Sequence, residues 1–206
     1  MRHGAHRQPI EEPAVVEALG NLGSLRVYEV ETTSIPVGSR FLVVAFPVDG
    51  GFRFAAFDLG LQDDSGGTRV EGFQANGGGH GLLRANVAVR WEWAHMDSVP
   101  TEGDDECYLS VSDAVTRSRY ALLCDAAAFE CSTVLVAEET LAPASVSLDG
   151  QCDGVDEDAA PEPREAFVYS LNVLDRNQVE LRKPDGTAAA PTIRWRETSA
   201  LDPVLP

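Results

Sequence analysis

Lysine is almost missing from this sequence of 206 residues. Lys183 is the one lysine among 16 basic side chains, which face 33 acidic side chains and leave a formal net charge of −17. Proteins that bind nucleic acids or anionic membranes use lysine and arginine to neutralise phosphates. The charge therefore argues against a nucleic-acid partner, and it suits a protein that meets salt, divalent cations or basic partners.

Long apolar runs are missing as well. No run approaches the roughly 20 residues that a membrane-spanning helix needs, so we expect no membrane span. Residues 1–6 lack the apolar segment of a signal peptide, so the chain is either cytoplasmic or begins after a removed signal. Hydrophobic residues make up 44% and charged residues 24% of the chain. These ordinary fractions favour a globular domain over a disordered one.

Helical periodicity is scarce, and a period of two dominates instead. One short helix is predicted over 12–19, because Pro13 lies near its start and Gly20 follows its end. The clearest alternation covers 82–95, where one face carries Ala85, Val87, Val89, Trp91, Trp93 and His95. This alternation predicts a half-buried strand.

Turn signals divide the rest of the chain into short strands. Asp49-Gly50 between the runs 39–48 and 51–59 predicts a hairpin, and 165–174 with 178–183 predicts another. The remaining predicted strands are 24–31, 68–73, 107–112, 119–124, 130–137, 144–148 and 191–196, and the predicted loops are 62–68, 74–81, 101–106 and the acidic 149–164. We therefore predict an all-β protein, a single jelly-roll-like β-sandwich over 12–197 with flexible tails at 1–11 and 198–206.

Four cysteines, Cys107, Cys124, Cys131 and Cys152, allow two disulfides, and no C-x-x-C spacing supports a zinc ribbon or a thioredoxin-like centre. A turn at 126–129 places Cys124 opposite Cys131, and a loop at 113–118 places Cys107 opposite Cys124. Opposed antiparallel residues lie within disulfide range. We favour the Cys124–Cys131 pair because its turn is tighter, which leaves Cys107 for Cys152. The alternative is four reduced cysteines that pack as small core side chains.

An acidic segment over 149–158 reads Asp-Gly-Gln-Cys-Asp-Gly-Val-Asp-Glu-Asp. It resembles the Asp-rich, Cys-containing calcium-binding motifs of secreted bacterial proteins and, more distantly, thrombospondin type 3 repeats. The resemblance implies calcium ligands at Asp149, Asp153, Asp156 and Asp158, a disulfide at Cys152, and an extracellular or cell-envelope location. Carboxylates at short spacing with glycines suit the six to eight oxygen ligands that calcium takes. A solvated acidic loop is the alternative.

No set of residues in the sequence points to catalysis. Asp63-Asp64-Ser65-Gly66-Gly67 resembles the nucleophile segment of serine proteases, but only His3 and His6 precede it, so we interpret it as a turn. The glycine run 77–81 lacks the lysine and the following helix of a phosphate loop.

The face of Trp91, Trp93 and His95 is a candidate ligand-binding surface, since exposed aromatic rings stack on sugars, although the same face equally suits a core. We expect a non-enzymatic extracellular or envelope module for binding or assembly. The alternatives are a structural subunit of a cytoplasmic or viral-type assembly and a carbohydrate-binding module that uses the tryptophan face.

Overall fold

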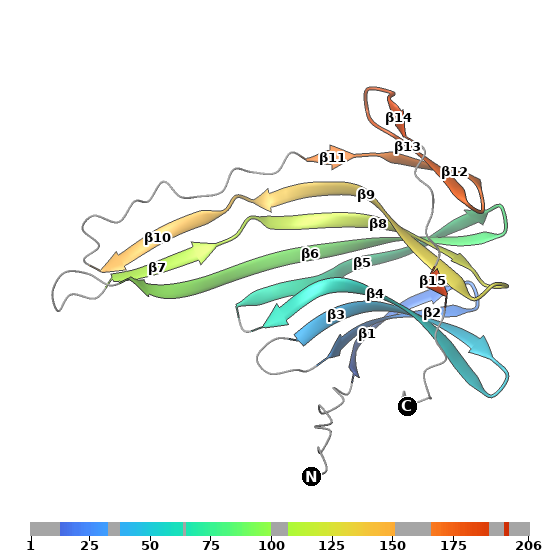
Figure 1. The fold of residues 1–206 in the computed structure, drawn as a ribbon, viewed down its shortest axis with the longest axis horizontal. Coiled ribbons are helices and arrows are strands. Elements are labelled where there is room, and N and C mark those ends of the chain that lie inside the picture. The colour runs from blue at the N-terminus through green and yellow to red at the C-terminus, as the bar shows by residue number, and fades with distance from the viewer. Residues whose placement is uncertain are drawn as a thin grey trace, which may run out of the picture.

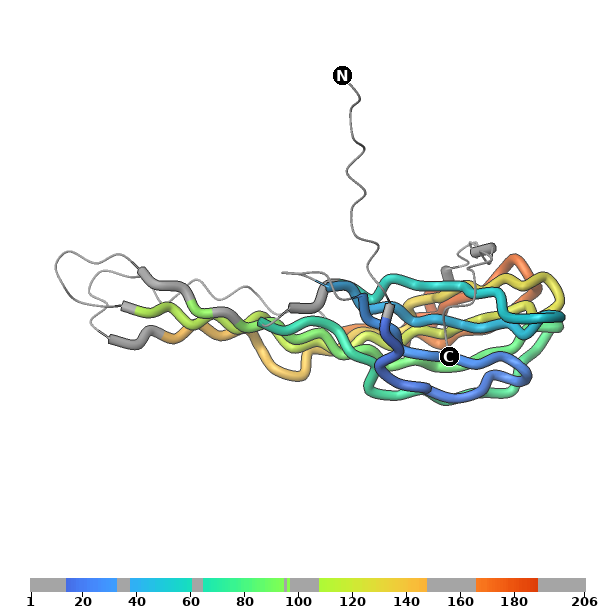
Figure 2. Tube along the Cα trace, turned by 90° about the horizontal axis from the view of Figure 1, so that it is seen from below, coloured from blue at the N-terminus to red at the C-terminus, as the bar shows by residue number. Residues whose placement is uncertain are grey.

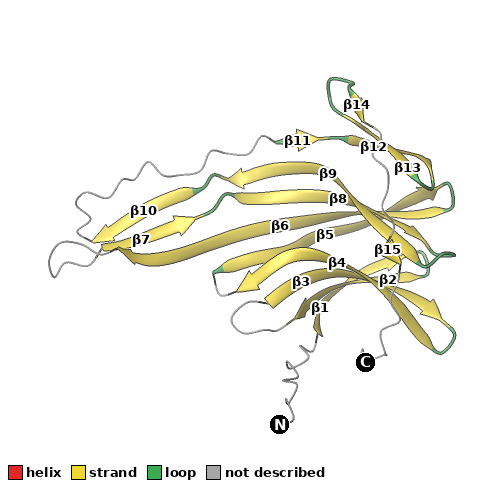
Figure 3. Cartoon of the chain, viewed as in Figure 1, coloured by secondary structure: helices red, strands yellow, loops and turns green. Residues whose placement is uncertain are grey.

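The computed structural model describes residues 13–32, 38–63, 65–99, 107–150, 166–189 and 196–197, and these are almost entirely β-strand (Figures 1 and 3). The all-β prediction is thereby confirmed. The first four strands are β1 (Pro13–Leu22), β2 (Leu25–Thr32), β3 (Gly38–Val48) and β4 (Gly51–Asp63). The next six are β5 (Gly66–Gly79), β6 (Leu82–Val99), β7 (Cys107–Ser112), β8 (Val115–Asp125), β9 (Glu130–Ala142) and β10 (Ser145–Gly150). The last five are β11 (Phe167–Val168), β12 (Ser170–Asp175), β13 (Gln178–Arg182), β14 (Ala188–Ala189) and β15 (Arg196–Glu197).

Eight strands follow one another as an antiparallel meander in the order β1-β2-β3-β4-β5-β6-β8-β9. Strands β4 and β5 pair at only two positions, Gln62 with Gly67 and Asp63 with Gly66, and then separate. The first four strands consequently fold over the next four, and β1 packs against β5 and β6. Figure 2 shows the resulting body as the thicker part of the molecule.

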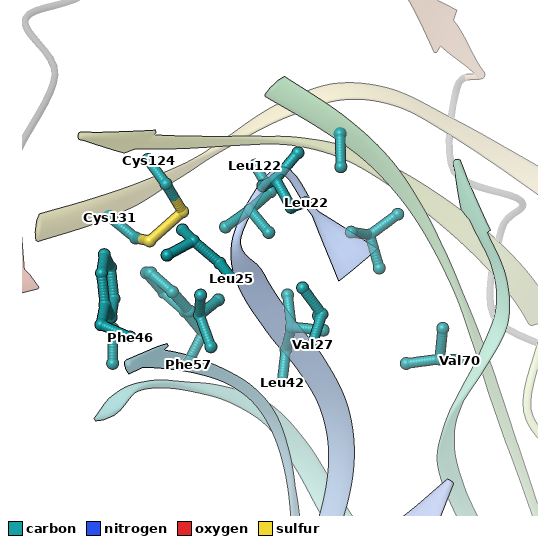
Figure 4. Close-up of a cluster of buried hydrophobic side chains, with 14 of the residues drawn as sticks. Leu22, Leu25, Val27, Leu42, Phe46, Phe57, Val70, Leu122, Cys124 and Cys131 are labelled. Atoms are coloured by element: carbon teal, nitrogen blue, oxygen red, sulfur yellow. A yellow bond between two sulfur atoms is a disulfide. The ribbon is translucent and has the colours of Figure 1, made fainter. Parts of the chain in front are cut away.

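The main core lies between these two layers (Figure 4). Every strand of the meander contributes inward-facing residues to it. Its largest fully buried side chains include Phe46, Leu22, Leu25, Leu42 and Leu122. Glu29 of β2 is also buried, and its carboxylate accepts hydrogen bonds from Arg40 of β3 and from the backbone N–H of Val70 in β5. Because β2 and β5 belong to different layers, this carboxylate joins them.

A flat arm extends from the body (Figures 1 and 2). It is a three-stranded sheet made of the second half of β6, β7 and β10. Strand β7 lies in the middle and pairs with β6 on one edge and with β10 on the other. A separate sheet, β12-β13-β14, covers the outer face of β8 and β9, where Val179 packs on Leu123. Arg176, in the turn between β12 and β13, forms ion pairs with Asp125 and Glu130.

The helix predicted over 12–19 is wrong, because these residues from Pro13 onward belong to β1. Bulges between Val15 and Glu17 and between Ala18 and Gly20 interrupt the pairing with β2. A bulge places two residues opposite one and breaks the alternation of side chains. The apolar residues of β1 therefore lack a clean period of two. Pro13 and Gly20 match the residues that often flank a helix, which explains the wrong prediction.

Other predicted details also differ. The meander replaces the crossed connections of a jelly roll. The predicted loops 62–68 and 74–81 are largely strand, and only short turns remain there. The predicted hairpin around Asp49-Gly50 is confirmed by the pairing of Val48 with Gly51. The predicted loop 101–106, the tails 1–11 and 198–206, and most of 149–164 and 191–196 lie outside the described residues.

The cysteine register is half confirmed. Cys124 pairs with Cys131 across β8 and β9, and the two form a disulfide with an S–S distance of 2.01 Å. The predicted opposition of Cys107 and Cys124 is wrong, because β7 pairs with β6 and β10 rather than with β8. The backbone of Cys107 lies opposite Gly150 at the end of β10, and Cys152 lies outside the described residues.

Candidate ligand-binding cavity

A cavity of about 450 Å³ lies between the two layers where the arm leaves the body. Five strands of the meander, β4, β5, β6, β8 and β9, line it together with the link between β7 and β8. Its lining combines one large aromatic ring, hydroxyl groups and two carboxylates, contributed by Leu59, Thr68, Val89, Trp91, Asp113, Ala114, Thr116, Ser118, Tyr120 and Glu138. We call this space the central cavity.

Irregular pairing shapes the central cavity. The separation of β4 from β5 leaves the space open on one side. On the other side the pairing of β8 with β9 shifts between Val115 and Thr116 and again between Arg119 and Tyr120. Bulges of this kind increase the local twist and bend a strand. The second shift places Glu138 opposite Ser118, and both line the cavity.

Three polar side chains form a connected set on one wall. The Ser118 hydroxyl donates a hydrogen bond to Oε2 of Glu138 over 3.1 Å, and Tyr120 is hydrogen-bonded to Ser118. Burial raises the pKa of the Tyr120 phenol, and the charge of Glu138 raises it further, although the bond to Ser118 acts in the opposite direction. The phenol is therefore neutral near pH 7, where it both donates and accepts hydrogen bonds.

Thr68 contributes a hydroxyl group that has no partner in the described part of the chain. Thr68 is only 4% exposed, and its Oγ1 atom is buried. A buried hydroxyl without a hydrogen bond costs about 1–3 kcal/mol. Because Thr68 lines the cavity, a ligand bound there lies next to the residue that carries this cost.

Trp91 provides the aromatic surface of the cavity, which its strand position explains. Along β6 the inward face changes from the fully buried Val87 and the nearly buried Val89 to the half-buried Trp91. Trp91 is thus partly buried and lines the cavity. Trp93 is half-buried two residues further along, at the start of the arm, and lies outside the cavity lining.

Of the three residues predicted to bind a ligand, the structure places only Trp91 in the central cavity. The backbone of His95 pairs with Val111 in the arm, and its side chain lies outside the described part of the structure. Sequence reasoning missed Tyr120, Ser118 and Glu138. The alternation of Thr116, Ser118 and Tyr120 along β8 was the available signal, but it does not show that Glu138 faces the same space.

Of the four predicted calcium ligands, only Asp149 lies among the described residues. The backbone of Asp149 lies in β10 at the end of the arm, and Asp153, Asp156 and Asp158 lie outside the described residues. Within the described ranges, no group of three or more His, Cys, Asp or Glu side chains is arranged to hold a metal ion. The calcium site remains a prediction.

Comparison with models of protein families, with curated proteins and with solved structures finds no match to this chain. In the described part of the chain, no helix has the length and apolar character needed to cross a bilayer. The site must therefore be interpreted from its own chemistry.

Proposed function

We propose that this protein is an extracellular or envelope binding module whose central cavity holds a neutral, hydroxyl-rich ligand, with a carbohydrate as the best match. The observation that carries the proposal is the position of the Trp91 ring beside the hydrogen-bonding wall of Tyr120, Ser118 and Glu138. Sugars present apolar C–H faces that pack on aromatic rings and hydroxyl groups that need donors and acceptors. Ligand sites of this kind combine an apolar surface with a few placed polar groups.

The charge of the lining selects against other ligand classes. Among the described residues, Asp113 and Glu138 line the cavity, whereas no arginine, lysine or histidine does. An anionic ligand would lose its hydration without gaining a cation in return. A sugar hydroxyl can donate to either carboxylate, and such charge-assisted hydrogen bonds are stronger than neutral ones.

A titration of neutral oligosaccharides, followed by tryptophan fluorescence, tests this function. Binding should change the emission of the wild-type protein, and Trp91→Phe should remove most of that change. Trp93→Phe is the matched control, because Trp93 lies on the same strand face but outside the cavity lining. Ser118→Ala should weaken binding by about tenfold, as expected for one lost hydrogen bond in a buried site.

Two results would contradict the proposal. One is binding of amines instead of neutral sugars, since Trp91 and the two carboxylates would then act as a cation site. The other is release of sugar from the bound oligosaccharide, which would make the protein a hydrolase.

The proposed location and the proposed calcium site have separate support. The Cys124–Cys131 disulfide is compatible with an oxidising compartment, and the 149–158 segment resembles secreted calcium-binding motifs. Calcium at one hundred times its dissociation constant should stabilise the protein by about 2.7 kcal/mol. At this chain length that is a rise of about 5–10 °C in melting temperature. The rise should disappear with a chelator and in the Asp153→Asn/Asp156→Asn variant.

The arm favours a second candidate function, that of a structural subunit in a larger assembly. Strand β10 pairs with β7 alone among the described strands, and no described strand covers its other edge. Free strand edges are ready templates for another chain. Light scattering at high concentration distinguishes the two functions, because an assembly subunit should form defined oligomers and an isolated binding module should stay monomeric.

A further inference from the structure

A second cavity, of about 250 Å³, lies on the outside of the body between the turn that joins β5 to β6 and the edge strand β12. It is distinct from the central cavity and shares no lining residue with it. Its lining consists of a glycine-rich turn, one histidine, one arginine and an apolar floor, namely Gly77, Gly78, Gly79, His80, Leu82, Arg84, Leu123, Leu171, Asn172 and Val173. We call it the turn cavity.

Arg84 is the charged group of the turn cavity. Other half-buried arginines on the sheet have acidic partners: Arg40 pairs with Glu29, and Arg90 pairs with Glu92. Arg84 has no such partner in the described part of the chain, and its Nε atom is buried without a hydrogen bond. A buried guanidinium nitrogen without a hydrogen bond is destabilising. In a chain with 33 acidic residues, an arginine held in a cavity without an acid points to an anionic group from outside.

The turn beside Arg84 is rich in glycine, and the strand that leads into it is irregular. In the pairing of β5 with β6, the register jumps from Asn76 to Gly79, so Gly77 and Gly78 have no partner residue on β6. A side chain at Gly78 would overlap the carbonyl oxygen of Leu82, so this position requires glycine. His80 and Gly81 close the turn with φ angles of 57° and 80°. Gly77, Gly78 and Gly79 therefore bring main chain without side chains against the cavity.

Apart from Asn172, the rest of the lining is apolar. Leu82 is 3% exposed and Leu123 is fully buried, and together they form the floor. Leu171 and Val173 of β12 are half-buried and form one wall. A small apolar group beside the charge of a ligand can therefore pack on Leu171 and Val173.

We infer that the turn cavity binds a carboxylate attached to a small apolar group, as at the C-terminus of a peptide or in a short free acid. The fork of one guanidinium matches a planar carboxylate in shape and in charge. A dianion such as phosphate needs more than one cation, in a protein whose net charge is already −17. Because Gly77, Gly78 and Gly79 line the cavity without side chains, a bound carboxylate can approach their backbone, as in the capture of terminal carboxylates by backbone turns.

Solution NMR of the full chain tests this inference. The probes are N-acetyl-Ala-Val with a free carboxylate, the same peptide as its C-terminal amide, and isobutyrate. The free peptide should shift the amide signals of Gly77, Gly78 and Gly79 and the Nε–H signal of Arg84, and the peptide amide should bind at least tenfold more weakly. Tighter binding of the peptide than of isobutyrate identifies a peptide terminus as the natural ligand, and equal binding identifies a free acid.

Two variants complete the test. Arg84→Gln should weaken binding of the free peptide by at least tenfold, whereas Arg119→Gln should leave it unchanged, because the exposed Arg119 lies outside the turn cavity. Arg84→Lys keeps the charge but loses the fork, and it should bind with intermediate affinity. Equal binding of the acid and the amide, full binding by Arg84→Gln, or an absence of shifts with both acids would overturn the inference. None of these results depends on sugar binding in the central cavity.

Discussion

Replacing Glu29 by alanine should weaken the contact between the two layers of the body. The Glu29 side chain is 3% exposed, and its Oε1 atom lies 2.8 Å from Nη1 of Arg40 and 3.2 Å from the backbone nitrogen of Val70. Removing one partner of a buried ion pair costs about 3–5 kcal/mol. Arg40 keeps a second partner, because its Nη2 lies 3.0 Å from Glu31. We therefore expect the lower end of the range, about 3 kcal/mol.

Urea unfolding at equilibrium measures this change in the free energy of unfolding. In a thermal melt, the same loss of about 3 kcal/mol should lower the melting temperature by roughly 6–12 °C. Glu29→Gln keeps an oxygen for the Val70 N–H and should cost about 1–2 kcal/mol. Glu31→Ala is the matched control, since Glu31 also pairs with Arg40 but is 28% exposed, and it should cost about 1 kcal/mol or less. Equal effects of Glu29→Ala and Glu31→Ala would refute the claim that Glu29 joins the layers.

Three further predictions concern single features of the body. Replacing Cys124 and Cys131 together by alanine opens a loop with a sequence separation of 7, and loop entropy predicts a loss of about 2–3 kcal/mol in urea unfolding. Gly78→Ala should lower the melting temperature, because its Cβ would overlap a backbone carbonyl of β6, whereas Gly77→Ala, with open space around it, should not. Tyr120 should ionise above the usual pKa, because burial raises it. Its stabilising contribution is complete below the pKa of about 10 of an unfolded tyrosine and is lost as the pH rises through the folded pKa. An ultraviolet titration should show this late ionisation in the wild type, and Tyr120→Phe should remove it.

Local signals in the sequence were sufficient to predict strand pairing where the two paired strands are joined by a short turn. The Asp49-Gly50 hairpin and the register of Cys124 with Cys131 both follow from short turns, and both are confirmed. The position of β7 could not be obtained in this way. It pairs with β10 and with the far half of β6, although the hairpin pattern favoured β8. Long-range pairing depends on the whole sheet rather than on one turn.

The central cavity was predictable only in part. The alternation along β6 identifies the face of Trp91, but it does not show where that face leaves the core. The meeting of Ser118 with Glu138 depends on a shift of register between Arg119 and Tyr120. Such a bulge leaves no clear signal in the composition of either strand. The same kind of irregularity in β1 produced the mistaken helix.

Unfolding of Thr68→Val, with and without a sugar that the wild type binds, tests the role of the central cavity most directly. Valine has nearly the shape of threonine but lacks the buried, unpartnered hydroxyl. If that hydroxyl serves a ligand, Thr68→Val without sugar should be as stable as the wild type or more stable by about 1 kcal/mol. With sugar present, the variant should gain less stability than the wild type. A variant that is destabilised without sugar, yet gains as much from the sugar as the wild type does, would contradict a ligand-binding role for the cavity.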